Sequence, residues 1–262
     1  MKRFEILSLI FIILISACKK EESEINPNNS GLLYQVKFGD KLYAEYTYNG
    51  EGQVLEEKSR MFYTQHHYQN GKLISSDHYY DPGMFSSTYV IAQAAMNRKE
   101  WVNPLNTEKS STITYSYDNN GKLTKTLNEI NNCEYTYDDH NRINRQIFFD
   151  ENKVSGYIEF YYDNRDNMVK RLHYWILSNG EPELQTTTEY EFDNHPNPYQ
   201  SLKSLMLPGK YSNTNNIVKE TYTIHGEVDS WIEKVTVTEN NYTYNSLGFP
   251  INKNGQESYI YF

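Results

Sequence analysis

The side chains that could perform catalysis are scattered along the 262-residue sequence and do not fall into a known catalytic or metal-binding spacing. GxSxG, HExxH, GxxxxGK[ST], GxGxxG and CxxC are all absent. His66 and His67 are adjacent, so on a strand they would point to opposite faces and could not bind one metal ion. The turn at Asp118 begins like a calcium loop, but its fifth position is Lys122, which cannot be a ligand. The sequence therefore predicts no metal site and no cofactor.

Acidic pairs and one thiol are the remaining catalytic candidates. Paired carboxylates could cleave glycosidic bonds, and close pairs occur at Asp138 and Asp139 and at 181–183 and 189–191. Solvated turn and strand-face positions explain all of them. Cys133 has no His or Lys beside it, which is typical of a small buried strand residue rather than a nucleophile. We therefore expect that the protein is not an enzyme. A carbohydrate-active enzyme is the third-ranked alternative, after a binding module and a scaffold subunit.

Aromatic side chains are the stronger functional signal, since the chain has 25 Tyr, 11 Phe and 3 Trp. Exposed Tyr and Trp match the mixed apolar and hydroxyl surface of a sugar with little loss of entropy. Core packing or cross-strand pairing is the alternative for each candidate, and capture of a peptide along an open sheet edge is a further one. The candidate ligand-binding residues are Trp101, Trp175, Trp231, Tyr79, Tyr80 and Tyr174.

Composition narrows the class of partner. The chain has 34 acidic and 25 basic residues and a formal charge of -9, which argues against nucleic acid as a ligand. Mean hydropathy is low, at -0.79, but an aromatic content of 15% is too high for a disordered chain. We expect half-exposed sheets rather than buried helices, because so much of the apolar area carries a hydroxyl.

Residues 1–17 have the layout of a secretory signal peptide: Lys2 and Arg3, an apolar stretch over 6–15, then small residues before Cys18. The apolar stretch is too short to span a membrane, and charged residues follow it at once. The run from Ile15 to Cys18 resembles the lipobox of bacterial lipoproteins, which implies acylation of Cys18 and a membrane anchor through its acyl chains. With Cys18 acylated, Cys133 has no partner for an intramolecular disulfide.

Residues 18–31 read as the lipidated cysteine and a flexible tether, charged at first and then rich in Asn, Pro and Ser. Its root-mean-square reach is roughly 20 Å. The cationic and acidic pairs directly after Cys18 resemble the surface-export signal of Bacteroidetes lipoproteins. That resemblance implies an outer-membrane protein facing the cell exterior, with the periplasmic side as the alternative.

A short hairpin pattern recurs through residues 32–262. Aromatics at i and i+2 fall on one face of a strand, and a following Asp or Asn can bond its own backbone while a later Gly or Asn accepts a left-handed conformation. Each copy predicts strand, turn of three to five residues, strand. We expect turns one residue longer after Tyr162 and Tyr244 than after Tyr117. The aromatic residues that mark the copies are Tyr48, Tyr68, Tyr117, Tyr137, Tyr162, Phe192 and Tyr244.

Two stretches break the pattern and predict short helices. Residues 89–100 are rich in helix formers and follow Ser and Thr caps. Residues 199–206 lie between a proline start and a proline stop. The segment around Ser212 is expected to be a loop.

The YxYDxxGxL units resemble the YD-type (Rhs-like) repeats of bacterial surface proteins. Together with the lipobox, the DNHPNPY element from Asp193 and the loop at Asn215, they resemble a family of Bacteroidetes lipoproteins without an assigned function. YD repeats are associated with carbohydrate binding or with shells around toxin domains, so the resemblance implies one of these roles.

The sequence thus predicts a mainly β protein: a single repeat-built antiparallel meander over 32–262, curled or two-layered, with one or two short helices in insertions. The predicted function is a non-enzymatic, outer-membrane-anchored binding module with a glycan as ligand. A scaffold subunit that binds another envelope protein is the alternative.

Overall fold

The computed structural model describes residues 31–59, 61–80, 102–128, 132–226 and 234–262. They form one antiparallel sheet of 17 strands, which confirms the predicted mainly β meander. The strands are β1 (Leu33–Phe38), β2 (Lys41–Tyr48), β3 (Val54–Lys58), β4 (Phe62–Gln69), β5 (Lys72–Tyr80), β6 (Ser111–Tyr117), β7 (Leu123–Leu127), β8 (Asn132–Tyr137), β9 (Ile143–Asp150), β10 (Lys153–Tyr162), β11 (Met168–Ile176), β12 (Pro182–Pro196), β13 (Asn215–Ile224), β14 (Val235–Glu239), β15 (Tyr242–Tyr244), β16 (Pro250–Lys253) and β17 (Glu257–Tyr261).

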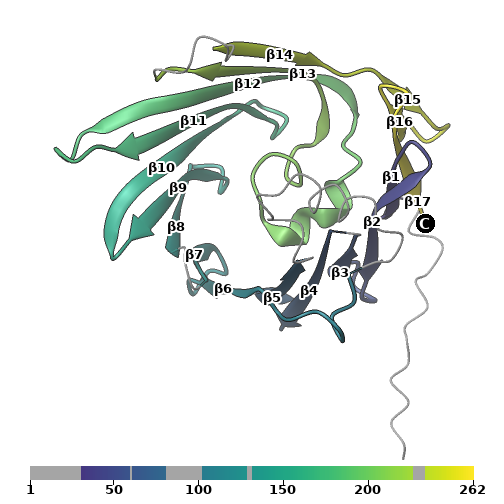
Figure 1. Cartoon of the computed structure of the whole chain (residues 1–262). Helices are drawn as coiled ribbons and strands as arrows, with labels where there is room; N and C mark the ends of the chain where they lie inside the picture. The colour runs from purple at the N-terminus through teal and green to yellow at the C-terminus, as the bar shows by residue number, and fades with distance from the viewer. Residues whose placement is uncertain (1–30, 60, 81–101, 129–131, 227–233) are drawn as a thin grey trace, which may run out of the picture.

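The sheet curls round on itself (Figure 1), and we name the space that its concave face surrounds the hollow. Successive strands pair from β1 to β14, while β15 pairs with β16, β16 with β17, and β17 with β1. Among the described residues, no ladder joins β14 to β15. At that junction, the backbone N–H of Asn240 donates to the carbonyl of Val218 at 2.8 Å. A sheet this wide is expected to curl, because each strand is rotated relative to its neighbour.

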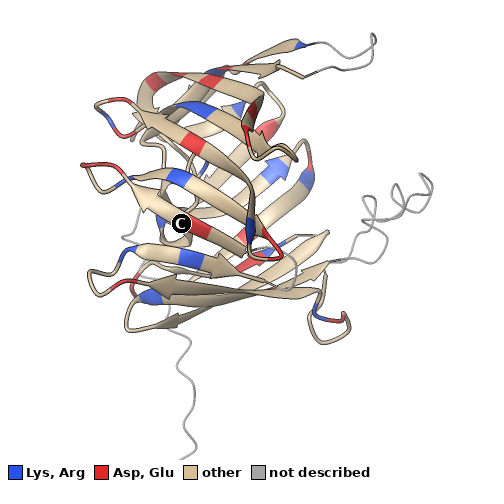
Figure 2. Ribbon diagram, turned by 90° about the vertical axis from the view of Figure 1, so that its left-hand side faces the viewer, with Lys and Arg blue, Asp and Glu red and all other residues tan. Residues whose placement is uncertain are grey.

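The two faces of the curled sheet differ in chemistry. On the outer face, opposite charges meet across neighbouring strands, and Figure 2 shows charged residues along the strands and in the turns. The inner face carries the buried rings and aliphatic side chains, such as Tyr46, Val54 and Phe160. The outer face is therefore hydrated, and the hydrophobic core lies against the inner face. The outer pairs include Glu45 with Lys58, Lys125 with Glu134, Arg145 with Glu159 and Lys170 with Glu189.

Five of the seven repeated turns share one geometry, while the turn after Tyr68 is a tighter one over Asn70 and Gly71, both at positive φ. In the copy after Tyr117, the Asp118 carboxylate accepts the backbone N–H of Asn120 at 2.9 Å and of Lys122 at 2.8 Å, and Gly121 has φ 82°. The turns after Tyr162 and Tyr244 have the same length, so the expected extra residue was wrong. The Asx oxygen accepts the i+2 and i+4 amides in turns that begin at Asn49, Asp118, Asp138, Asp163 and Asn245.

A contact between consecutive copies explains why a cation follows several of these turns. The Lys122 ammonium lies 5.0 Å from the ring centroid of Tyr137, whose hydroxyl donates to the carbonyl of Leu123 at 2.8 Å. Each ring is thus held between a cation and a backbone acceptor of the preceding copy. The same arrangement recurs for Lys72, Tyr117 and Leu73 and for Arg142, Tyr162 and Ile143.

The copy marked by Phe192 departs from this pattern. Its Asp193 accepts the backbone N–H of His195 at 2.9 Å, as in the other turns, but the second amide comes from Asn216 at 3.2 Å. Residues 197–214, named here the inserted segment, are therefore an insertion within a turn, and the short loop expected after Phe192 was wrong. The segment enters the hollow of the sheet (Figure 1).

The inserted segment supplies part of the main core. It carries a 3₁₀ helix, η1 (Gln200–Leu205), where a short helix was predicted. Leu202 and Leu205 pack with inner-face residues such as Leu33 and Val54. The helix predicted over 89–100 lies outside the described residues. Within the described part of the chain, no helix is long and apolar enough to span a membrane.

Candidate functional site

A buried set of asparagines holds the inserted segment in place. We name Asn167, Asn197, Asn213, Asn215 and Asn216 the asparagine network. All are buried, and Asn167 and Asn213 have no exposed surface. Burying so many amides is costly unless each makes hydrogen bonds. Their positions indicate that the segment must adopt one conformation.

Asn167 and Asn215 join β11 to the start of β13. The Asn167 amide nitrogen donates to Asn215 Oδ1 at 3.0 Å, and the backbone N–H of Asn215 donates to Asn167 Oδ1 at 2.9 Å. Asn167 Nδ2 also donates to Asp163 Oδ2 at 3.1 Å. Burial raises the pKa of Asp163, but hydrogen bonds from the Asn167 and Arg165 backbones outweigh it and lower that pKa overall.

Asp193 holds the end of β12 against β13 and β15. Its carboxylate accepts from Asn216 Nδ2 at 3.0 Å and from the Tyr244 hydroxyl at 2.5 Å. His195 stacks on the Tyr244 ring, with the centroids 3.8 Å apart. The first Asp of the DNHPNPY element thus ties β12 to β13 and β15.

Asn197 and Asn213 lie near the two ends of the inserted segment, and their side chains bond backbone groups. Asn197 Nδ2 donates to the carbonyls of Lys210 at 2.8 Å and Asn213 at 3.1 Å. Asn213 Oδ1 accepts the backbone N–H of Met168 at 2.8 Å. These bonds fix the backbone of Lys210 against the inner face of the sheet.

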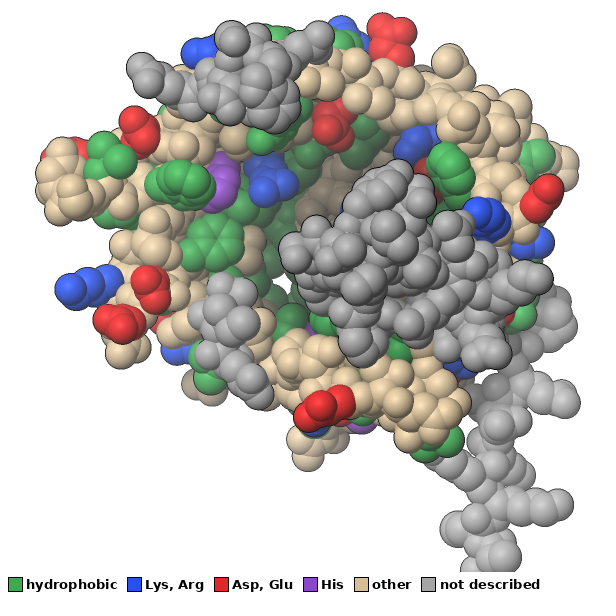
Figure 3. Space-filling model, viewed as in Figure 1, with side chains coloured by type: hydrophobic (Ala, Val, Ile, Leu, Met, Phe, Trp, Pro, Cys, Tyr) green, Lys and Arg blue, Asp and Glu red, His purple; other side chains and the backbone are tan. Residues whose placement is uncertain are grey.

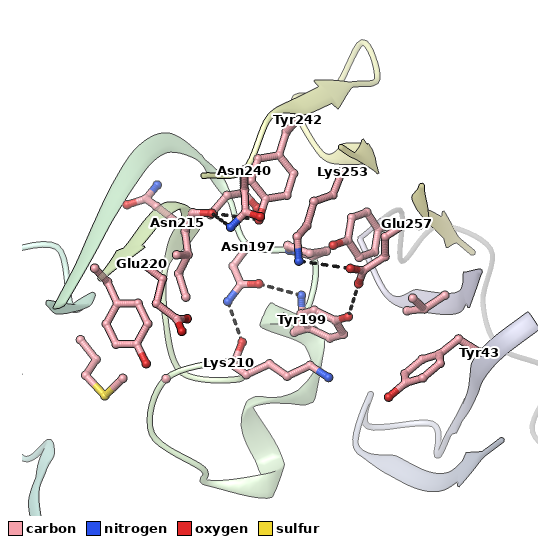
Figure 4. A pocket seen from close by; sticks show the side chains of 18 of the residues that line it. Tyr43, Asn197, Tyr199, Lys210, Asn215, Glu220, Asn240, Tyr242, Lys253 and Glu257 are labelled. Carbon is pink, nitrogen blue, oxygen red and sulfur yellow. Dashed lines mark hydrogen bonds and ion pairs between the residues drawn. The ribbon is translucent and has the colours of Figure 1, made fainter. Parts of the chain in front are cut away.

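A cavity of about 420 Å³ lies between the inserted segment and the inner face of the sheet, and we name it the inner cavity (Figure 4). Tyr43, Tyr199 and Tyr242 contribute rings, and the asparagines contribute amides to its lining. One buried acceptor, Asn216 Oδ1, has no partner among the described residues. Aromatic surface beside hydrogen-bonding groups is suited to a small polar ligand with an apolar face. Figure 3 shows part of the hollow; grey atoms cover the rest of that view.

Of the charged groups that line the inner cavity, Lys253 and Glu257 form an ion pair, whereas Lys210 and Glu220 form none with the described residues. The Lys253 ammonium lies 3.2 Å from one Glu257 oxygen, and the Tyr199 hydroxyl donates to the other at 2.9 Å. Lys210 instead lies over rings, 4.1 Å from the Tyr199 centroid and 5.3 Å from that of Tyr211. Desolvation by burial lowers the pKa of Lys210, opposed by Glu57 and Glu257. The Glu220 carboxylate also lines the cavity, and none of the described residues pairs with it.

A second polar cluster lies on the inner face of β3 to β6. His66 Nε2 is 3.1 Å from Glu57 Oε1, and His66 Nδ1 is 2.8 Å from Ser76 Oγ. A serine, histidine and carboxylate in line could activate a nucleophile, but Ser76 has no exposed surface. In this geometry the hydroxyl cannot reach a substrate. Among the described residues, no group of three or more His, Cys, Asp or Glu could hold a metal ion.

The structure does not bring the predicted ligand-binding aromatics together. Trp175 is 56% exposed on the inner face of β11, next to His173, and Tyr174 stacks on Tyr157 with centroids 4.7 Å apart. Tyr79 and Tyr80 lie on β5, where Tyr79 makes an edge contact with Tyr63. None of these four lines the inner cavity. Trp101 and Trp231 lie outside the described residues.

The other sequence candidates have ordinary structural settings. Cys133 is a buried free thiol on β8, and Asp138 is the turn aspartate that pairs with Arg142 at 2.7 Å. Glu189 and Glu191 lie on β12 and pair with lysines of neighbouring strands. Lys210 and the asparagine network were missed. The DNHPNPY element and the loop at Asn215 were the signals in the sequence that could have found them.

No family model matches the chain, and no curated protein matches it. A porin-like protein from Bacteroides uniformis is 12% identical with a TM-score of 0.44, over 89% of this chain and 98% of that one. A porin-like protein from Bacteroides vulgatus is 10% identical with a TM-score of 0.40, over 88% and 98%. The Tc holotoxin pore of Photorhabdus luminescens is 16% identical with a TM-score of 0.33, over 84% of this chain and 12% of that chain. At these values the likeness says nothing about activity or ligand.

Proposed function

We propose that the protein is a lipid-anchored module of the outer membrane that faces the cell exterior and binds a saccharide in the inner cavity without chemically changing it. The anchor rests on Cys18 and the sequence before it. The binding site rests on the cavity of about 420 Å³ that lies between the inserted segment and the sheet.

The mixed lining of the inner cavity is the observation that carries the saccharide proposal. Tyr43 is 44% exposed and offers a ring face to the apolar side of a sugar. Glu220 and amides such as Asn240 are hydrogen-bonding partners for hydroxyl groups. The asparagine network fixes the inserted segment, which forms one wall of the cavity, before a ligand arrives, and this lowers the entropy cost of binding.

Two observations support binding rather than catalysis. Both oxygens of Glu257 are engaged, by Lys253 and by Tyr199, so this carboxyl group is not free to donate a proton to a leaving group. Ser76, the nucleophile candidate of the second cluster, is fully buried.

A calorimetric titration of the full-length chain, purified in mild detergent, against a panel of neutral and acidic oligosaccharides tests this proposal. We expect saturable binding with a Kd in the micromolar range and no hydrolysis product by chromatography. Release of shorter saccharides would favour the carbohydrate-active enzyme. No heat of binding with any panel member would overturn the saccharide proposal and favour the scaffold alternative, with an envelope protein as partner.

A further inference from the structure

The charge of Lys210 has no counter-ion in direct contact with it in the described part of the chain. Among the described residues, no carboxylate oxygen lies within 4.0 Å of its ammonium. Two carboxylates act on Lys210 from further away: Glu57, which lies 3.1 Å from His66, and Glu257, which is engaged by Lys253 and Tyr199. An ammonium above a ring is attracted to it, but the ring does not neutralise the charge.

The backbone around Lys210 is built to hold the side chain there. Gly209 has φ 95°, and its N–H donates to Ser212 Oγ at 2.9 Å. The Lys210 carbonyl accepts from Asn197 Nδ2 at 2.8 Å. Figure 4 shows the side chain extending beside Tyr199 toward Tyr43.

Keeping this ammonium in the hollow has a cost that a ligand could offset. Although Lys210 is exposed, partial desolvation of its side chain lowers its pKa. The side chain still meets solvent from within the inner cavity. An anionic group that entered the cavity would supply a counter-ion for the ammonium and form a charge-assisted hydrogen bond with it.

We propose that the saccharide bound in the inner cavity is acidic and that Lys210 binds its carboxylate. This inference rests on the proposed function and adds the ligand class. Lys210 bonds the carboxylate, Tyr43 packs against the ring, and Glu220 on the β13 side accepts hydroxyl groups. The formal charge of -9 gives no long-range attraction for an anion, so selection depends on direct contact with Lys210.

Matched pairs of ligands test the inference. Trisaccharides of galacturonate, glucuronate and mannuronate are titrated calorimetrically, each beside its carboxyl-reduced counterpart, against the full-length protein. We expect at least one acid to bind tenfold or more tightly than its reduced form. Lys210→Met keeps the apolar stem over Tyr199 and is expected to abolish that difference.

Lys203→Met is the matched control, because Lys203 lies exposed on the same inserted segment and does not line the cavity. It should leave both affinities unchanged. Equal binding of acid and reduced forms, or an acid preference that survives in Lys210→Met, would overturn the inference and leave the proposed function standing. Absence of binding by acids, reduced forms and the neutral panel alike would overturn both.

Discussion

Alanine in place of Asn167 is expected to lower the free energy of unfolding by about 3 kcal/mol and to weaken saccharide binding at least tenfold. The substitution removes both amide bonds to Asn215 and the bond to Asp163. It leaves the buried N–H of Asn215 without an acceptor, and an unpaired buried donor costs about 1–3 kcal/mol. Urea unfolding followed by circular dichroism measures the change.

The effect on binding follows from the position of the network. Asn215 and Asn216 border the inner cavity, and the inserted segment that carries Lys210 is held by the same set of bonds. Asn194→Ala is the matched control, because Asn194 is an exposed asparagine of the DNHPNPY element whose side chain bonds only the exposed Arg165 among the described residues. It should change stability by less than about 0.5 kcal/mol. If Asn167→Ala behaved like the control, the network would not position the segment.

Serine in place of Cys18 is expected to move the protein from the membrane fraction to the soluble fraction. The hydroxyl cannot take the place of the thiol that the lipobox resemblance marks for acylation. Several acyl chains contribute about 0.8 kcal/mol per buried methylene, so their loss removes the anchor. Immunoblots of fractionated cells and palmitate labelling of both variants measure this. Palmitate incorporation by Cys18→Ser would contradict lipidation at this residue.

The direction in which the anchored protein faces needs a separate readout. Protease added to intact cells should degrade the wild-type protein, whose tether carries the charged pairs at 19–22. Full protection in intact cells and degradation only after lysis would place the protein on the periplasmic side instead.

The local part of the fold could be predicted because it depends on neighbouring residues. A turn such as that at Asp118 needs an Asx side chain and a left-handed residue three positions on, and both are visible in the sequence. The alternation of Tyr115, Ser116 and Tyr117 likewise identifies the face of β6 that is half-buried.

The site could not be predicted because it depends on contacts between residues far apart in the chain. Asn167 meets Asn215 across 48 positions, and Tyr244 meets Asp193 across 51. The helix and the loop of the insertion were predicted, but not that the insertion begins inside a turn, because the first half of that turn follows the repeat. No local pattern indicated that residues 197–214 fill the hollow of the sheet.

The prediction of Trp175 as a ligand-binding residue shows a second limit of prediction from sequence. An exposed Trp on a strand suits a sugar surface, but exposure says nothing about what faces it. Met168, at the start of β11, lines the inner cavity. Trp175 is seven positions further along the strand, about 23 Å away at the usual rise per residue.

Comparison of Tyr43→Ala with Trp175→Ala tests most directly whether the inner cavity is the binding site. Both variants remove a partly exposed ring from the sheet, 44% exposed for Tyr43 and 56% for Trp175. Calorimetric titration with the tightest-binding saccharide should show an affinity at least tenfold weaker for Tyr43→Ala and unchanged for Trp175→Ala. Loss of binding in Trp175→Ala with full affinity in Tyr43→Ala would contradict the assignment and place the ligand on β11.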